Sequence, residues 1–316
     1  MQLPNWINTD TTIYEYINDK LCSCLWGLRL LNLEHHWGKY DLSNVRIAVI
    51  DSGIDTQHED FDDTICQGYN FVENNKDVRD KSGHGTGVIG IIAAVANNQL
   101  GIAGAAYGAK IIPLKVIDDK QYVNIHRIIK ALDWCILNNI DIINISMGID
   151  CCYWRYGDFF NKNCLRKIEL CINKAIENNI IIISSLGNKS RRGMDFPANI
   201  SKVIGVGAYG INELSGEIYI PNFNNKGNEA TIYAPGENIL TTLPNNQYGY
   251  LSGTSLAAAY VTAANVYAKA VYPDLKPEFA KKIMLETSGI FLNKDKKYKF
   301  LNVDAYLNKI EEIVNG

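Results

Sequence analysis

Short apolar runs alternate with amphipathic stretches along most of the chain. The first clear run is Val-Arg-Ile-Ala-Val-Ile at residues 45–50. A nearly continuous, β-branched run of this length is typical of a strand buried on both faces of a parallel sheet. Comparable runs predict further strands at residues 109–116, 140–146, 180–184, 203–206 and 230–234.

Apolar side chains recur at helical spacing between these runs. In residues 124–138 the apolar face consists of Ile125, Ile128, Ile129, Leu132 and Ile136, which is the stripe of an amphipathic helix. Similar patterns predict helices at residues 12–21, 88–96, 164–178, 255–271 and 277–286. Because strands and helices alternate, we expect an α/β fold with a mainly parallel sheet and helices on both faces.

The chain shows no internal repeat and no Gly/Ser-rich linker. We therefore expect one domain, residues 26–316, preceded by an N-terminal extension of residues 1–25. The aromatic and cysteine-bearing stretch at residues 150–163 is interpreted as an insertion. It either projects from the body or packs on it as a loop.

Composition narrows the class of protein. With 316 residues, 47% of them hydrophobic, the chain can bury a full core. Its net charge of -3 comes without a long run of one sign, which argues against nucleic acid or a membrane as partner. The sequence has no signal-peptide pattern, no apolar run of about 18 residues, and eight cysteines without paired zinc-site spacing. These features favour a cytoplasmic protein with free thiols.

Four polar residues lie at the ends of predicted elements. Asp51 follows the first strand, His84 lies in Gly-His-Gly-Thr-Gly at a helix start, Asn188 follows a later strand, and Ser255 lies in Gly-Thr-Ser at another helix start. Taken singly, each has an ordinary explanation, such as a helix cap or a structural histidine. Together they form a set with a common chemistry.

That chemistry is hydrolysis of an amide. Sites in parallel sheets form at the carboxyl edge of the strands, so we expect these residues to converge there. Ser255 would attack a carbonyl, His84 would take and return the proton, and Asp51 would orient the imidazole. Asn188 would donate a hydrogen bond to the oxyanion. No cofactor is required for these steps.

The motifs resemble those of the subtilisin family, the subtilase or S8-type serine proteases. The blocks are residues 49–53, 83–86, 186–188 and 253–255, in the Asp, His, Ser order of that family. The resemblance covers about residues 26–306 and implies a subtilisin-like three-layer fold and serine endopeptidase activity on peptides or proteins. Gly87, Leu256 and the pair Ala259-Tyr260 depart from the family's usual residues, but none is a catalytic group.

The same resemblance implies further binding residues. An extended substrate would pair with Ser146, Met147 and Gly148 as an added strand. The wall of the pocket for the substrate's P1 side chain, the S1 pocket, would include Ser184, Ser185, Leu186, Gly187 and Asp195. The loop at residues 95–102 resembles the family's calcium loop, with Asp60, Asn97 and Asn98 as oxygen ligands for a structural calcium. A plain turn is the alternative for that loop.

Two protease interpretations compete. Residues 185–188, Leu256, Gly87 and the insertion after Gly148 resemble lanthipeptide (lantibiotic) leader peptidases, which remove the leader from a modified peptide precursor. Residues 233–244 and the missing export signal resemble intracellular subtilisins, which degrade cytosolic proteins broadly. We favour leader removal.

Asp195 bears on that choice. Within the S1 pocket it would pair with a P1 Arg or Lys and direct cleavage after a basic residue; outside the pocket it would be a solvated loop acid. A third interpretation, an inactive peptide-binding pseudoprotease, is disfavoured by the intact set of four residues.

Overall fold

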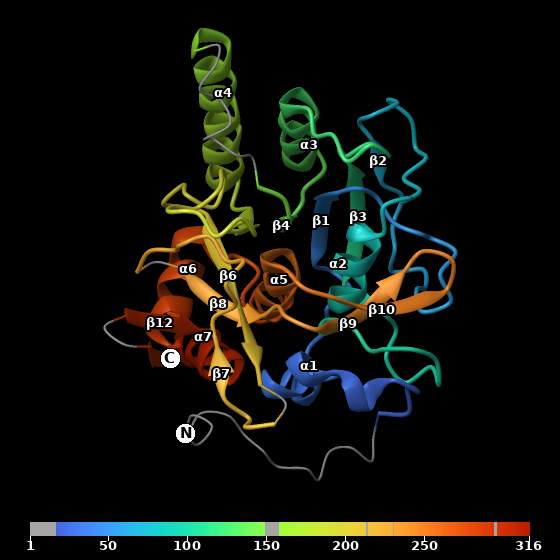
Figure 1. The fold of residues 1–316 in the computed structure, drawn as a ribbon, viewed down its shortest axis with the longest axis vertical. Helices are drawn as coiled ribbons and strands as arrows, with labels where there is room; N and C mark the ends of the chain where they lie inside the picture. The colour runs from blue at the N-terminus through green and yellow to red at the C-terminus, as the bar shows by residue number, and fades with distance from the viewer. Residues whose placement is uncertain (1–16, 149–157, 213, 230, 294–295) are drawn as a thin grey trace.

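A mainly parallel sheet forms the centre of the molecule (Figure 1). The computed structural model describes residues 17–148, 158–212, 214–229, 231–293 and 296–316, and for residues 158–164 only the course of a helix. The strand order is β11 (Gly289–Asn293), β12 (Lys296–Phe300), β8 (Ile232–Pro235), β6 (Ile204–Ile211), β5 (Ile181–Ser185), β4 (Ile142–Ile145), β1 (Arg46–Asp51), β3 (Lys110–Lys115) and β2 (Tyr69–Asn70). Neighbours from β12 to β2 pair in parallel.

Two further pairings are antiparallel. Strand β7 (Ile218–Tyr219) pairs with β6, and β11 pairs with β12. Strands β9 (Ile239–Leu243) and β10 (Gln247–Leu251) form a separate hairpin. The parallel centre agrees with the predicted sheet.

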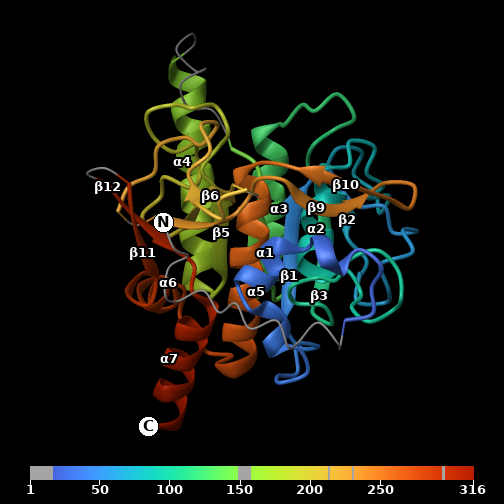
Figure 2. The ribbon, with the colours of Figure 1, turned by 60° about the horizontal axis from the view of Figure 1, so that its bottom comes forward.

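Helices cover both faces of the sheet, as Figures 1 and 2 show. One face packs against α3 (Ile125–Leu137) and α4 (Asp158–Glu177). The other packs against α2 (His84–Ala93), α5 (Thr254–Val271), α6 (Pro277–Glu286) and α7 (Val303–Asn315). Shorter elements near the N-terminus are η2 (Cys22–Cys24), α1 (Trp26–Leu30) and η3 (Leu33–His36).

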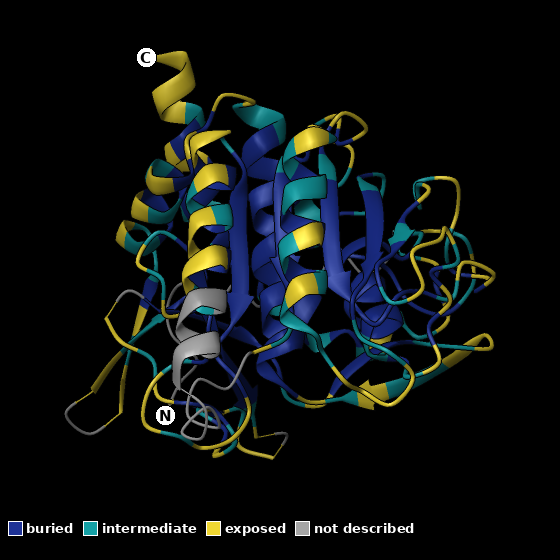
Figure 3. Cartoon of the chain, turned by 90° about the horizontal axis from the view of Figure 1, so that it is seen from above, coloured by how far each residue is buried: buried dark blue, intermediate teal, exposed yellow. Residues whose placement is uncertain are grey.

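The alternation within β1 explains the three layers. Ile47 and Val49 belong to the core beneath α2 and α5, whereas Ala48 and Ile50 belong to the core beneath α3 and α4. Successive side chains of a strand point to opposite faces, so an apolar residue at every position seals both faces. Figure 3 shows the result: a buried sheet beneath helices such as α3, whose exposed residues lie on its outer side. The predicted α/β fold, with a mainly parallel sheet and helices on both faces, is confirmed.

Helix α5 is the most enclosed helix of the described chain. Every residue from 254 to 269 is buried, and in Figure 2 the helix lies in the middle of the molecule. Its small residues, mainly alanines, let sheet and neighbouring helices approach closely.

Several elements are not among those predicted. They are the hairpins β9–β10 and β11–β12, the short strands β2 and β7, the short helices η2, α1 and η3, and α7. Helix α4 also begins at Asp158, earlier than the apolar pattern indicates. The remaining predicted strands and helices are present within a few residues of their expected ends.

The predicted helix at residues 12–21 is wrong in its described part, because residues 17–21 form loop and turn. This segment instead bonds to the body: Lys20 N donates to Leu100 O at 2.9 Å, and Leu21 N to Gly101 O at 2.8 Å. The predicted insertion lies largely outside the described residues. Among the helices that the structure describes, none combines the length and apolarity needed to cross a membrane.

Candidate active site

Strand β1 delivers a carboxylate to the carboxyl edge of the sheet. Asp51, its last residue, is 1% exposed. Its Oδ1 accepts hydrogen bonds from Ser52 N at 2.7 Å and from His84 Nδ1 at 2.8 Å. Because an ionised carboxylate only accepts, the imidazole carries its proton on Nδ1 and keeps Nε2 as the free base nitrogen.

The start of α2 is held by a second acid, Asp80, which is 6% exposed. Its Oδ1 accepts from Ser82 N and Gly83 N, and its Oδ2 from the backbone and hydroxyl of Thr86, all at 2.8–3.0 Å. These bonds satisfy amides that a helix start leaves without partners. Burial alone would raise the pKa of Asp80, but the hydrogen bonds from Thr86 and Gly83 outweigh it and lower that pKa.

Helix α2 approaches β1 so closely that only glycine fits at one position. A Cβ on Gly85 would lie 2.2 Å from the carbonyl oxygen of Gly53, far inside van der Waals contact. The Gly85 N–H also donates to Ser52 Oγ at 2.9 Å. The helix start therefore fixes His84 against the end of β1.

The charge around His84 favours its protonated form. Burial lowers the pKa of His84, but the negative charge and hydrogen bond of Asp51, with the charge of Asp80, outweigh it and raise that pKa above its ordinary value. About a third of the side chain, 35%, stays exposed. The residue can therefore take up a proton and still reach solvent or substrate.

Ser255 is the second residue of α5 and is buried at the helix mouth. Its carbonyl oxygen accepts a hydrogen bond from Ser146 Oγ at 3.2 Å. Helix α5 packs along α2. Both residues lie in the described part of the chain, where His84 bonds to Ser82 and Asp51 and not to Ser255 Oγ. Catalytic hydrogen bonds are often long before substrate binds.

Asn188 follows β5 and turns its amide toward the same helix mouth. Its Oδ1 accepts from Thr254 N and Thr254 Oγ1, both at 2.9 Å. A Cβ built on Gly253 would lie 2.9 Å from Asn188 Nδ2 and 3.1 Å from Ser255 Oγ. An amide donor and a hydroxyl thus border one small space, which is the arrangement that stabilises an oxyanion at the point of attack.

The predicted substrate segments lie at the ends of adjacent parallel strands, β4 and β5. Met147 is half-buried and Gly148 is exposed, so this edge is open to an added strand. Ser184 and Leu186 have no exposed surface. Ser185 is also buried. A wall built from these residues would therefore offer a substrate mainly the backbone of residues 184–187, and their predicted binding role stays a prediction.

Asp195 lies between two glycines of those segments. A Cβ on Gly148 would come 2.4 Å from Asp195 Oδ2, and one on Gly187 would come 2.3 Å from the same oxygen. The carboxylate is only 5% exposed, so Asp195 is not a solvated loop acid. It lies beside Gly148 and Gly187, two of the predicted substrate-binding residues.

The predicted calcium loop is closed by hydrogen bonds. Asp60, fully buried, accepts from Asn98 Nδ2 and from Ile102 N, both at 2.8 Å. Asn97 is exposed, and its Oδ1 accepts from Asn18 N at 3.2 Å instead of facing Asp60. Within the described ranges there is no group of three or more His, Cys, Asp or Glu that would hold a metal ion.

Sequence reasoning missed the residues that hold these groups in place. They are Asp80, Thr254, Lys115 and Asn225. Lys115, buried at the end of β3, donates to Ser52 O at 2.6 Å, next to Asp51. Two of the four carry a sequence signal: Asp80 is an acid shortly before a helix start, and Thr254 lies in the Gly-Thr-Ser block.

Comparisons with known proteins agree with this geometry. Residues 43–308 match the Peptidase_S8 profile, the subtilase family. The chain is 32% identical over 250 residues to a thermostable alkaline protease of Halalkalibacterium halodurans, covering 78% of this chain and 63% of that protein. It is also 32% identical over 250 residues to the major intracellular serine protease of Bacillus subtilis, covering 75% and 72%.

A solved structure shares the architecture. Fervidolysin from Fervidobacterium pennivorans, described as a keratinolytic enzyme related to subtilisin, superposes with a TM-score of 0.78 at 26% identity, covering 90% of this chain and 45% of that one. The match to a thermophilic serine proteinase of Bacillus sp. AK1 covers 50% of that protein. The chain spans about half to two thirds of the length of that proteinase and of the alkaline protease.

Proposed function

The chain belongs to the subtilase family, and from that premise we propose that it is a serine endopeptidase acting on peptide or protein substrates. The observation that carries the proposal is the 2.8 Å hydrogen bond from His84 Nδ1 to Asp51 Oδ1. It leaves Nε2 available as a base near the helix mouth that holds Ser255. A pseudoprotease that only binds peptides does not need a carboxylate that orients a histidine, so this bond favours the enzyme.

The reaction proceeds in two acyl-transfer steps. His84 Nε2 takes the Ser255 hydroxyl proton while Oγ bonds to the peptide carbonyl carbon, and Asn188 Nδ2 donates to the resulting oxyanion. The imidazolium, stabilised by Asp51, gives its proton to the leaving amine as the C–N bond breaks. Water then repeats the sequence on the acyl-enzyme, releasing the acid and restoring Ser255.

Labelling by a fluorophosphonate tests this proposal. We expect the folded protein to be labelled on Ser255, and Ser255→Ala to remain unlabelled with an unchanged circular dichroism spectrum. A folded protein that takes no label and cleaves no peptide would instead favour the peptide-binding pseudoprotease.

We infer further that the enzyme cuts after a basic residue and removes the leader of a lanthipeptide precursor. The support is Asp195: a buried carboxylate between Gly148 and Gly187 suits pairing with a P1 Arg or Lys. A site that demands one side chain fits a single processing cut better than broad degradation. A peptide library varied at P1 tests the inference, with Asp195→Asn as the isosteric control.

Broad intracellular proteolysis is the second candidate, favoured by the likeness to the major intracellular serine protease of Bacillus subtilis. The two candidates differ in product pattern. Leader removal gives one cut in a lanthionine-bearing precursor and leaves unfolded casein largely intact, whereas broad proteolysis degrades both. A precursor gene and a lanthionine synthetase gene beside this gene would favour leader removal.

Both candidate functions fit a cytoplasmic protein. This location is supported by the free thiols of the described cysteines, Cys22, Cys24, Cys66, Cys135 and Cys171.

We also propose that the loop of residues 95–102 binds a structural calcium ion. The carboxylates of Asp60 and Asp19 are hard oxygen donors of the kind calcium takes, and Asp19 accepts from Asn97 N and Asn98 N in this loop. The Asn98 amide would have to turn its oxygen toward the ion, because its Nδ2 now donates to Asp60. A lower unfolding temperature in EDTA than in calcium would support the site, and equal temperatures would argue for the hydrogen-bonded turn.

A further inference from the structure

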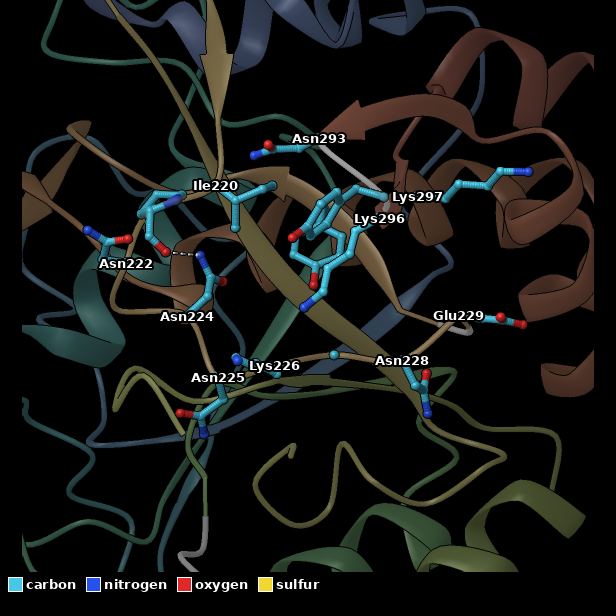
Figure 4. Close-up of a pocket in the computed structure, with 14 residues that line it drawn as sticks. Ile220, Asn222, Asn224, Asn225, Lys226, Asn228, Glu229, Asn293, Lys296 and Lys297 are labelled. Carbon is cyan, nitrogen blue, oxygen red and sulfur yellow. Dashed lines mark hydrogen bonds between the residues drawn. The ribbon is translucent and has the colours of Figure 1, made fainter. Parts of the chain in front are cut away.

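An open cavity of about 730 Å³ lies outside the set of residues assigned to catalysis (Figure 4). Two parts of the chain that are distant in sequence form most of its lining. They are the segment of residues 220–229 and the β11–β12 hairpin, with Tyr233 of β8 between them in the sequence. The volume falls within the range of about 300–1,000 Å³ that is common for ligand-binding clefts.

One wall of this cavity is bonded to the loop that carries Asn188. Asn225 N donates to Gly187 O at 2.9 Å, and Lys226 N donates to Arg191 O at 2.8 Å. Asn225 and Lys226 both belong to the lining. Because the two bonds fall on either side of Asn188 in the sequence, the cavity and the predicted oxyanion donor share one wall. The cavity therefore borders the candidate active site.

The lining carries more positive than negative charge. Its charged side chains are Lys226, Lys296, Lys297 and Glu229, and all four are exposed. Figure 4 shows Lys296 extending into the cavity and Glu229 pointing away from it. Within the described ranges none of the three lysines has an ion-pair partner. Their ammonium groups are therefore available to an anionic ligand.

The rest of the lining suits a peptide. Asn222 and Asn293 are exposed, and their amides offer the donors and acceptors that pair with a peptide backbone. The half-buried Tyr298 packs edge-on against the buried Tyr233, with ring centroids 5.1 Å apart. Part of the lining is thus aromatic and held in place by packing. The net charge of the whole chain, -3, disfavours nucleic acid as the ligand.

We propose that this cavity is a second substrate-binding site, which takes an acidic stretch of the polypeptide that is cleaved at Ser255. The proposal rests on the endopeptidase function proposed above and deepens it by naming a substrate class, peptides with several Asp or Glu residues on one side of the cut. A contact remote from the reacting carbonyl is equally strong in the bound substrate and in the transition state. It therefore lowers KM and leaves kcat unchanged.

Peptides that differ only in charge test the proposal. Each carries the same cleavage sequence and a short run of glutamates or of glutamines, placed either before or after the cut. In one placement we expect kcat/KM to be about fivefold higher for the glutamate peptide, since exposed ion pairs are individually weak. The advantage should lie in KM and should shrink as the salt concentration rises. Equal values for both peptides in both placements would overturn the proposal.

Removing the lysines locates the effect. The double variant Lys226→Gln/Lys296→Gln should lose the preference for the glutamate peptide and cleave the glutamine peptide at the original rate. Lys299→Gln is the matched control, because Lys299 lies on the same strand, β12, but outside the lining. It should keep the preference. A preference that survives the double variant, or that falls equally in Lys299→Gln, would show attraction to the surface in general and would overturn the site.

A binding measurement separates this site from the catalytic function. In the Ser255→Ala background, fluorescence anisotropy follows a labelled glutamate-rich peptide that contains no cleavage sequence. We expect binding that the change Lys226→Gln/Lys296→Gln weakens about fivefold. Binding of this kind in a protein that cleaves nothing would contradict the enzyme and support the site. Cleavage without any binding of the acidic peptide would support the enzyme and overturn the site, and so would displacement of the peptide by a lower concentration of a single-stranded oligonucleotide than of unlabelled peptide.

Discussion

Asn188 and Thr254 are joined by two hydrogen bonds that end on one atom. The Asn188 side-chain oxygen accepts from the backbone N–H and from the hydroxyl of Thr254, each at 2.9 Å. Both bonds fix the oxygen side of the amide, so Nδ2 must face the opposite way, toward Gly253 and Ser255. The donor is set in place before any substrate arrives.

Replacing that donor should reduce turnover more than binding. For Asn188→Ala we expect kcat to fall by about 10²–10³ with little change in KM, because the lost bond forms only with the oxyanion. Steady-state kinetics on a P1 Arg peptide checks this. Asn188→Asp, similar in shape but without the N–H donors, should show a comparable loss, and full turnover in either variant would exclude the assigned role.

Asp51→Asn should leave the fold intact and nearly abolish catalysis. An amide in place of the carboxylate can donate to Nδ1, which favours the tautomer with its proton on Nε2. In proteases with this arrangement such a change lowers kcat by about 10⁴, and we expect a similar loss here. The circular dichroism spectrum should be unchanged. A variant with more than a tenth of the original kcat would show that Asp51 does not orient His84.

The acidic limit of activity should lie above the ordinary histidine value. His84 acts as a base only when neutral, and its pKa is raised by Asp51 and Asp80 against the effect of burial. As the pH falls through this raised pKa, kcat/KM should decline with a midpoint above about 6.5. Protonation of His84 stabilises the fold fully below its unfolded pKa, and that stabilisation disappears as the pH rises through the folded pKa.

Replacing Asp80 tests whether its charge contributes to the raised pKa of His84. In Asp80→Asn the midpoint of the pH profile should move to lower pH, because one of the two negative charges near His84 is gone. An unchanged midpoint would show that the charge of Asp80 does not affect the pKa of His84.

Asp80→Ala should destabilise the protein strongly. The change leaves several amides at the buried start of α2 without partners, at a cost of about 2–4 kcal/mol in the free energy of unfolding. Because the folded pKa of Asp80 is lowered, its stabilisation is present above the unfolded pKa and is lost as the pH falls through the folded pKa. Denaturant titration measures both effects. The half-buried neighbour Asp77, changed to Ala, loses a pair with the exposed Arg79 that solvent screens. It serves as the control and should alter stability little.

Parallel strands and buried helices could be predicted because their patterns are continuous. Residues 45–50 have an apolar side chain at almost every position, and α5 is rich in helix formers. The β9–β10 hairpin has no such run, since its strands carry threonines, a glycine and exposed residues. Its turn residues Asn245 and Asn246 both have positive φ, 64° and 54°, and an Asn-Asn pair at this point is a turn signal that was available.

The sequence of helix α7 also carries a clear helical pattern. Val303, Tyr306, Leu307 and Ile310 are its buried residues, spaced as one face of a helix, and Asn302 caps it by accepting from Ala305 N at 3.0 Å. The end of the chain therefore carried a helix start and an apolar stripe. Both follow from local sequence alone.

The site residues also fall into two groups: those that local sequence predicts and those that depend on the assembled fold. Asp51, His84, Asn188 and Ser255 stand at the ends of elements and in motifs, so sequence places them. Asn225 has neither property: its partners Asp195 and Leu186 lie 30 and 39 positions away. Its role depends on how the segment after β7 packs against the loop after β5, and that packing is a property of the assembled fold.

Ser255 is anchored to a helix whose residues 254–269 are all enclosed by the sheet and other helices. Such a segment can open only when the surrounding layers come apart. On heating, loss of turnover and loss of secondary structure should therefore coincide. No folded but inactive intermediate should appear first. Amide protons in the middle of this helix should exchange with solvent only through global unfolding, with protection that matches the global free energy of unfolding.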